Sequence, residues 1–165
     1  MNSEITSLIT QLIEVHEGRP WMGSSFDRKL GSLSNDEAFT TPGKQMHSVA
    51  QILAHLTFWR EEGILKIVSG SGSKTDDDPD NWPSNEALME MGWGTIKEKY
   101  DRSLSKLINL LAEREDDFLD QTYYDNDFKD VYPYRFLVHG MLHHDIYHLG
   151  QLGLIIKQIT VSSKQ

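Results

Sequence analysis

The sequence contains no cysteine among its 165 residues. This absence excludes a disulfide framework, a thiolate metal ligand and a catalytic thiol that belongs to the protein itself. The sequence also has no unbroken apolar run of about 18 residues, the length that a membrane-spanning helix needs. Its N-terminal segment is interrupted by acidic and polar residues, which argues against a secretory signal peptide. We therefore expect a cytoplasmic protein that does not bind a membrane.

Positive charge is scarce as well. The chain has 16 lysines and arginines against 25 aspartates and glutamates, so its formal net charge is −9. A phosphate backbone would be repelled by this balance, and no cluster of basic residues offsets it locally, so we expect no nucleic-acid partner. The length and the hydrophobic fraction of 38% are ordinary for one globular domain, which we place at residues 1–165.

Four segments have the apolar periodicity of amphipathic helices. They cover approximately residues 3–17, 44–68, 84–118 and 134–159. Gly92 and Gly94 are weak points of the third segment, because glycine has a low helix propensity. No long segment alternates apolar and polar residues as a half-buried strand does. Four long helices in one domain of this size predict an all-α protein, a four-helix bundle.

The connections between these helices are long. They cover residues 18–43, 69–83 and 119–133. Links of this length are uncommon unless they cover a binding site or cross over between parallel neighbours. We expect one of them to cover a site at one end of the bundle.

Four of the seven histidines lie in the segment HGMLHHDIYHLGQ, residues 139–151. His144 and His148 fill a gap in the apolar stripe of this helix, and their spacing of four residues lets both rings bind one divalent metal. Two buried imidazoles each need a polar partner, which favours a metal site. The alternative is a pair of core histidines that are satisfied by hydrogen bonds. His16 and His47 have no such pattern, and we assign them no role.

A functional metal site needs a third ligand from another element. His55 is the candidate, because it lies in a row with Ile52 and Trp59 on the flank of the apolar face of the second helix. A bundle can bring that flank against the fourth helix. His139 and His143 turn to roughly the opposite side of their helix, and we interpret them as solvated residues or contacts between helices, with a second surface metal site as the alternative.

Other side chains near the histidines are candidates for chemistry or binding. Gln151 lies on nearly the same side as the histidine pair and could hydrogen-bond at the metal, and Asp145 could orient a ligand imidazole. We name Gln151 and Asp145 as candidate catalytic residues, although Asp145 fits a surface acid equally well. Trp59 and Trp82 could form the walls of a pocket that binds a cofactor, although large aromatic residues more often belong to the core.

These motifs resemble those of the DinB-like superfamily, the DinB/YfiT-like metalloenzymes. The resemblance rests on HSVAQILAHLTFWREE in the second helix and HGMLHHDIYHLGQLGLIIK in the fourth, and the order and spacing match along the whole chain. It implies a four-helix bundle with up-down-down-up topology, often a homodimer, and an open three-histidine site for a divalent metal such as zinc or nickel. By this resemblance the ligands are His55, His144 and His148. The additional His143 departs from the family pattern.

Characterised members of the family include thiol-dependent enzymes, the bacillithiol S-transferases and mycothiol-dependent maleylpyruvate isomerase. A metal held by three neutral imidazoles keeps its charge and lowers the pKa of a coordinated water or thiol. The sequence has no general base comparable to the glutamate of an H-E-x-x-H motif. We therefore predict an enzyme that activates a low-molecular-weight thiol for transfer to an electrophilic small molecule. The alternatives are a metal-dependent hydrolase and a non-catalytic metal-binding module of a stress response.

Overall fold

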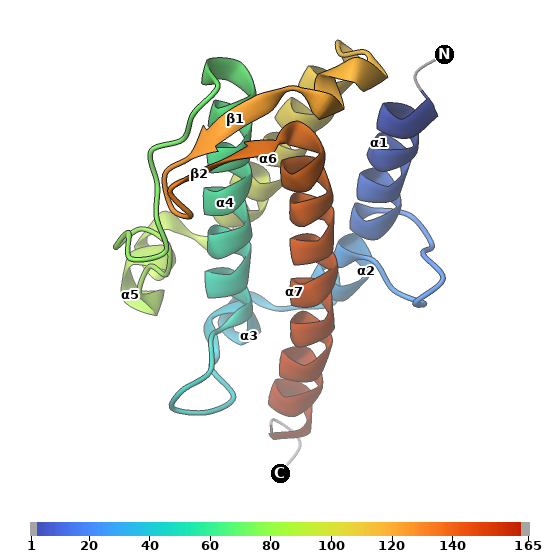
Figure 1. Ribbon diagram of the computed structural model, residues 1–165. Coiled ribbons are helices and arrows are strands. Elements are labelled where there is room, and N and C mark those ends of the chain that lie inside the picture. Colours follow the sequence, from blue (N-terminus) through green and yellow to red (C-terminus); the bar gives the residue numbers. More distant parts are fainter. Residues whose placement is uncertain (1–2, 163–165) are drawn as a thin grey trace.

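The chain forms four long helices that are joined by shorter elements (Figure 1). The structure is a computed structural model that describes residues 3–162. The long helices are α1 (Ser3–His16), α4 (Val49–Ser69), α6 (Trp93–Ala112) and α7 (Tyr134–Ser162). The shorter elements are α2 (Phe26–Leu30), α3 (Asn35–Phe39), α5 (Asn85–Met91), the 3-10 helix η1 (Asp116–Asp120) and the strands β1 (Thr122–Asp125) and β2 (Asp130–Pro133). None of the helices in the described range is long and apolar enough to cross a bilayer.

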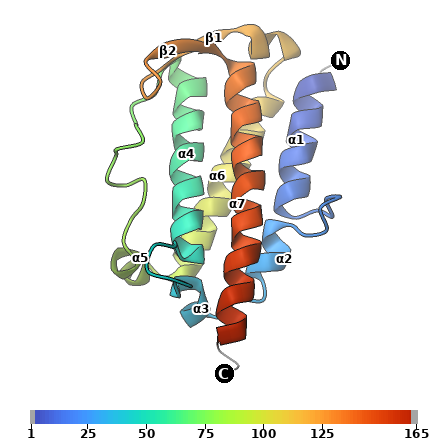
Figure 2. The same cartoon turned by 60° about the horizontal axis from the view of Figure 1, so that its bottom comes forward.

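The four long helices have the predicted up-down-down-up order. α1 and α7 run in one direction, and α4 and α6 run in the other (Figure 1). α4 and α1 each contact both α6 and α7, so the four helices enclose one core, with α7 lying between α4 and α1 in Figure 2. Because α4 and α6 are parallel, the chain has to return along the bundle between them, and residues 70–92 make this crossover. The prediction of a four-helix bundle is confirmed.

The two helices that carry the predicted ligand histidines, α4 and α7, pack closely against each other. Gly63 of α4 faces Met141 of α7, and a Cβ added at Gly63 would lie only 2.5 Å from Sδ of Met141. Side chains from the predicted apolar faces fill the core of the bundle, among them Leu12 of α1, Leu107 of α6 and Leu152 of α7, each no more than 1% exposed. Glycine at position 63 therefore lets the two helices approach each other without a clash.

The second and third predicted helices differ from the structure in their bounds. α4 begins at Val49 rather than near residue 44, because Ser48 caps it: Oγ of Ser48 accepts the Gln51 N–H at 3.1 Å, and Oε1 of Gln51 accepts the Ser48 N–H at 3.0 Å. The third predicted helix is interrupted at Gly92, whose φ of 86° is a conformation that favours glycine. That helix also ends at Ala112, well before residue 118.

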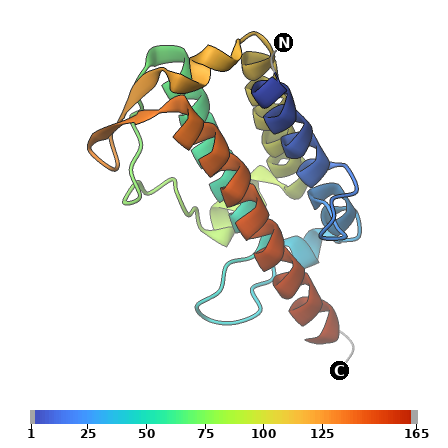
Figure 3. The same cartoon turned by 45° about the vertical axis from the view of Figure 1, so that its right-hand side comes forward.

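A short antiparallel hairpin was not predicted. β1 and β2 pair from Thr122 with Pro133 to Asp125 with Asp130, and they lie across the end of the bundle where α4 ends and α7 begins (Figure 3). The hairpin is joined to the crossover, since the Tyr124 N–H donates to the Gly70 carbonyl at 3.0 Å and Asp127 Oδ1 accepts the Asp76 N–H at 2.9 Å. Two of the long links therefore form one continuous wall beside α4 and α7.

Candidate metal centre

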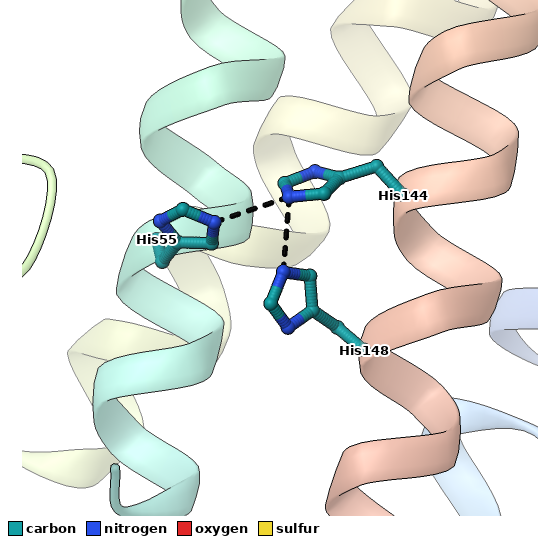
Figure 4. Close-up of side chains that lie close together, drawn as sticks. All are labelled: His55, His144 and His148. Carbon is teal, nitrogen blue, oxygen red and sulfur yellow. Dashed lines mark hydrogen bonds between the residues drawn. The ribbon is translucent and has the colours of Figure 1, made fainter. Parts of the chain in front are cut away.

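Three imidazoles from two helices converge on one point (Figure 4). Nε2 of His144 lies 3.1 Å from Nε2 of His55 and 2.9 Å from Nε2 of His148. Zinc–nitrogen bonds of about 2.0–2.1 Å place two ligand nitrogens about 2.9–3.4 Å apart, depending on the angle between them. The structure thus brings together the three histidines that were predicted as ligands, at a spacing that fits one metal ion.

The outer nitrogens of two of these rings are held by amide side chains. His55 Nδ1–H donates to Oδ1 of Asn81 at 2.7 Å, and His148 Nδ1–H donates to Oε1 of Gln151 at 2.7 Å. The Asn81 amide is itself oriented, because its Nδ2 donates to the Asp76 carbonyl at 3.0 Å. An amide oxygen only accepts, so the proton of each ring sits on Nδ1 and the lone pair of Nε2 faces the centre.

The donor set of this centre fits a metal ion. His144 can carry only one proton on Nε2, which cannot fully satisfy the two facing lone pairs of His55 and His148. A cation at the focus would satisfy all three nitrogens at once. Within the described range, no aspartate, glutamate, cysteine or further histidine joins the three as a fourth ligand. The centre therefore has the open coordination that is typical of catalytic sites rather than structural ones.

Burial keeps the three imidazoles neutral. Desolvation, helped by the neighbouring imidazoles, lowers the pKa of His55, of His144 and of His148 from 6.5 to about 4. Neutral imidazole is the form that binds metal, so all three are competent ligands at neutral pH.

The centre opens into a cavity of about 660 Å³. This volume falls within the range of about 300–1,000 Å³ that is typical of small-molecule sites. The lining comes from α4, α7, the crossover, the hairpin and the link before α4, and it includes Trp59, Trp82 and Gln151. The two tryptophans are therefore placed where a bound small molecule would contact them, and their role in binding stays a prediction.

Trp82 covers one of the ligands directly. Its indole stacks on the His55 ring at 3.8 Å between ring centroids and on the His47 ring at 3.7 Å, with 10° between the planes in each case. His47 also lines the cavity, and desolvation lowers its pKa. His47 and Asn81 are thus site residues that sequence reasoning missed. Neither lies on a periodic apolar face, so only the folded path of the links reveals them.

Asp145 lies elsewhere than expected. Both of its oxygens accept from Nη2 of Arg60 at 2.9 Å, and both side chains are buried. As the residue after His144, Asp145 points about 100° further round the helix, away from the metal centre. Asn81 and Gln151 hold the ligand imidazoles in its place. His139 also lies outside the centre, with Nε2 at 3.6 Å from Glu4 Oε1, and His143 is exposed.

The bundle and the open three-histidine centre together define a metal-binding helical bundle. Residues 22–152 match the family model of the DinB superfamily, and the chain belongs to that superfamily. The fold is similar to that of a solved structure described as "YfiT from Bacillus subtilis is a probable metal-dependent hydrolase with an unusual four-helix bundle topology". The TM-score is 0.64 and the sequence identity is 12%, over 97% of this chain and 90% of that chain. No sequence among the curated proteins matches this chain.

Proposed function

We propose that this protein is a divalent-metal-dependent enzyme that activates a low-molecular-weight thiol and transfers it to an electrophilic small molecule. One observation carries the proposal: a three-histidine centre, which no other residue of the described range 3–162 joins as a fourth ligand, opens into a cavity of about 660 Å³. Zinc or nickel bound there would act as a Lewis acid that lowers the pKa of a thiol. The thiol has to come from a second molecule, because the chain contains no cysteine.

The residues of the chain have distinct tasks in this proposal. His55, His144 and His148 hold the metal, and Asn81 and Gln151 keep the imidazoles in the required tautomer. The walls of the cavity, including Trp59 and Trp82, exclude water and hold the organic part of the substrates. A cytoplasmic location, which the sequence composition favours, and a homodimer, which the family resemblance implies, belong to the same proposal.

Hydrolysis is the second candidate, because the similar YfiT structure is described as a probable metal-dependent hydrolase. A hydrolase needs a general base close to the reacting water. Asp125 is a carboxylate of the cavity lining, but Lys66 Nζ binds it at 2.8 Å. Burial acts to raise the pKa of Asp125, and hydrogen bonds from Lys66 and from the Phe128 N–H outweigh it, so the pKa is lowered. A carboxylate held in this way is a weak base, so Asp125 is a poor general base for hydrolysis.

The decisive experiment combines elemental analysis with two assays. We expect about one equivalent of zinc or nickel per chain, as a single site requires, to be lost in His144→Ala/His148→Ala. His139→Ala/His143→Ala is the matched control, because this pair has the same spacing on the same helix but lies outside the centre. The metal-loaded protein is then given a panel of thiols with an aromatic electrophile, and separately a panel of esters and amides.

Metal-dependent consumption of thiol and electrophile together would support the first candidate. Hydrolysis without thiol consumption would support the second. A bound metal without turnover in either panel would contradict both and leave a non-catalytic metal-binding module.

A further inference from the structure

The wall of the cavity beyond the metal centre contains one lysine, and its charge is already neutralised by neighbouring carboxylates. Lys66 is the single lysine or arginine in the lining of this cavity, within the part of the chain that the structure describes. Its Nζ lies 2.8 Å from Oδ2 of Asp125 and 3.8 Å from Oε1 of Glu62. Lys66, Asp125 and Glu62 are 4%, 3% and 1% exposed. Two buried carboxylates therefore face one buried ammonium.

The carboxylates are themselves fixed, so Lys66 cannot easily turn away from them. Oδ1 of Asp125 accepts the N–H groups of Asp127 at 3.0 Å and Phe128 at 3.1 Å, which ties it to the turn of the hairpin. Oε1 of Glu62 accepts the Ser73 N–H at 2.8 Å from the crossover. Releasing the ammonium to a ligand would leave two buried carboxylates without their counter-ion, which is strongly unfavourable.

The remaining charged residues of the lining are acidic. Asp76 and Asp127 line the cavity in addition to Asp125, so the wall has three aspartates against one lysine. In the metal-free protein, an anionic group that entered would lose its hydration, meet net negative charge and find no free lysine or arginine in the lining. A cationic group would be attracted by the acidic lining.

Aromatic rings form much of the rest of the wall. Phe128, Phe136 and Tyr147 line the cavity and are exposed, and the rings of Phe128 and Phe136 lie 6.2 Å apart between centroids. Exposed rings at the mouth of a cavity gain by covering an apolar or aromatic ligand. The faces of such rings also attract an ammonium group.

We propose that this cavity selects its organic substrate by charge: it binds an aromatic molecule that carries an amine in preference to the carboxylate of the same shape. The inference rests on the proposed function only in taking this cavity as the substrate site. The features that carry it are the matched charge of Lys66, the acidic lining and the exposed rings.

Three ligands of the same shape test the preference: phenylpropylamine, phenylpropanol and phenylpropanoate. Calorimetric titration measures the dissociation constant of each ligand with the zinc-loaded protein and with the chelated, metal-free protein. The metal-free form is needed because a carboxylate ligand could otherwise gain affinity by binding the metal. In the metal-free protein we expect the amine to bind at least about tenfold more tightly than the carboxylate, with the alcohol between them.

Asp125→Asn is the informative variant, because it keeps the shape of the wall and frees Lys66 from its closest partner. We expect the ratio of amine to carboxylate affinity to fall by about tenfold. Asp130→Asn is the matched control: it removes the same charge from an exposed position of the same hairpin that does not line the cavity. If Asp125→Asn does not fold, Asp127→Asn removes a partly exposed lining charge and should lower the ratio by a smaller factor.

Equal or tighter binding of the carboxylate by the metal-free wild type would overturn the inference, and so would the absence of binding for all three ligands. An equal effect of Asp125→Asn and Asp130→Asn would overturn it as well. Because the metal-free protein shows the preference without any turnover, failure of thiol transfer and failure of charge selection are separate results.

Discussion

At the scale of single residues, the neutral imidazoles of the metal centre make the stability of the metal-free protein depend on pH. Burial lowers the pKa of His55, His144 and His148 to about 4 in the folded state, whereas an imidazole in the unfolded chain titrates near 6.5, about its unperturbed value. Between these two values the unfolded chain binds more protons than the folded protein. The free energy of unfolding therefore falls as the pH falls through this window and rises as the pH rises.

Chemical denaturation of the metal-free protein at several pH values between 7 and 4 would measure this dependence. This pH range covers the interval from the unperturbed imidazole pKa down to the lowered pKa values of about 4. We expect a shallower loss of stability in His144→Gln/His148→Gln than in the wild type. His139→Gln/His143→Gln should follow the wild type, because these rings lie outside the buried centre. Identical slopes in all three proteins would show that the buried imidazoles do not govern the loss.

The ligands themselves could be predicted at this scale, and their partners could not. His144 and His148 stand out because their spacing places both on a face that is otherwise apolar. Asn81 lies in a link without periodicity, so its bond to His55 depends on the tertiary path of residues 70–92. The partner of Asp145 was hidden for the same reason, since Arg60 is 85 residues away in the sequence.

At the scale of helices, the buried pair of Arg60 and Asp145 fixes α4 against α7 beside the metal centre. Arg60 is one and a half turns after His55, and Asp145 directly follows His144. Nη1 of Arg60 also donates to Oγ of Ser103 on α6 at 3.0 Å. A buried ion pair adds little net stability over apolar side chains of similar volume. We expect its contribution here to be the relative position of two helices that each carry metal ligands.

Two variants test this positioning role, because they should differ in stability while zinc affinity stays low in the more stable one. Asp145→Leu leaves a buried guanidinium unpaired and should lower the free energy of unfolding by about 3–5 kcal/mol. Arg60→Met/Asp145→Leu should recover most of that loss but bind zinc about 10–100-fold more weakly, the effect that displaced supporting groups have at metal sites. Urea denaturation and competitive zinc titration measure the two quantities. Wild-type zinc affinity in the double variant would contradict the positioning role.

The elements differ in how far the sequence predicts them. Long amphipathic helices are predictable because their apolar period extends over several turns, and the break at Gly92 follows from a weak point that the sequence displays. β1 and β2 have only four residues each, and their sequences TYYD and DVYP do not alternate apolar and polar residues. Their pairing is stabilised by contacts with the crossover, such as the bond from the Tyr124 N–H to Gly70, which no local pattern contains.

At the scale of the whole molecule, the up-down-down-up order explains why the metal centre opens sideways into a covered cavity. Parallel neighbours α4 and α6 require a crossover along the outside of the bundle, and this crossover passes the flank of α4 that carries His55. The periodicity of the helices predicts the bundle and the long links permit a crossover. The lateral position of the cavity follows only from the path that the links take in the fold.

Metal binding should therefore stabilise the whole molecule, because it joins helices that are far apart in the sequence. His55 on α4 and His144 on α7 are 89 residues apart, so the unfolded chain has no preformed site. A metal at about 100 times its dissociation constant raises the free energy of unfolding by about 2.7 kcal/mol, and each kcal/mol raises the Tm of a chain of this size by about 2–4 °C. We expect zinc to raise the Tm of the stripped wild type by about 5–10 °C, and His55→Ala to abolish this shift.

His47→Ala is the matched control, since His47 lines the same cavity and stacks on Trp82 without belonging to the ligand group. A full zinc-induced shift in His55→Ala would mean that the ion binds elsewhere, and loss of the shift in His47→Ala would mean that the ligand set is not the three histidines alone.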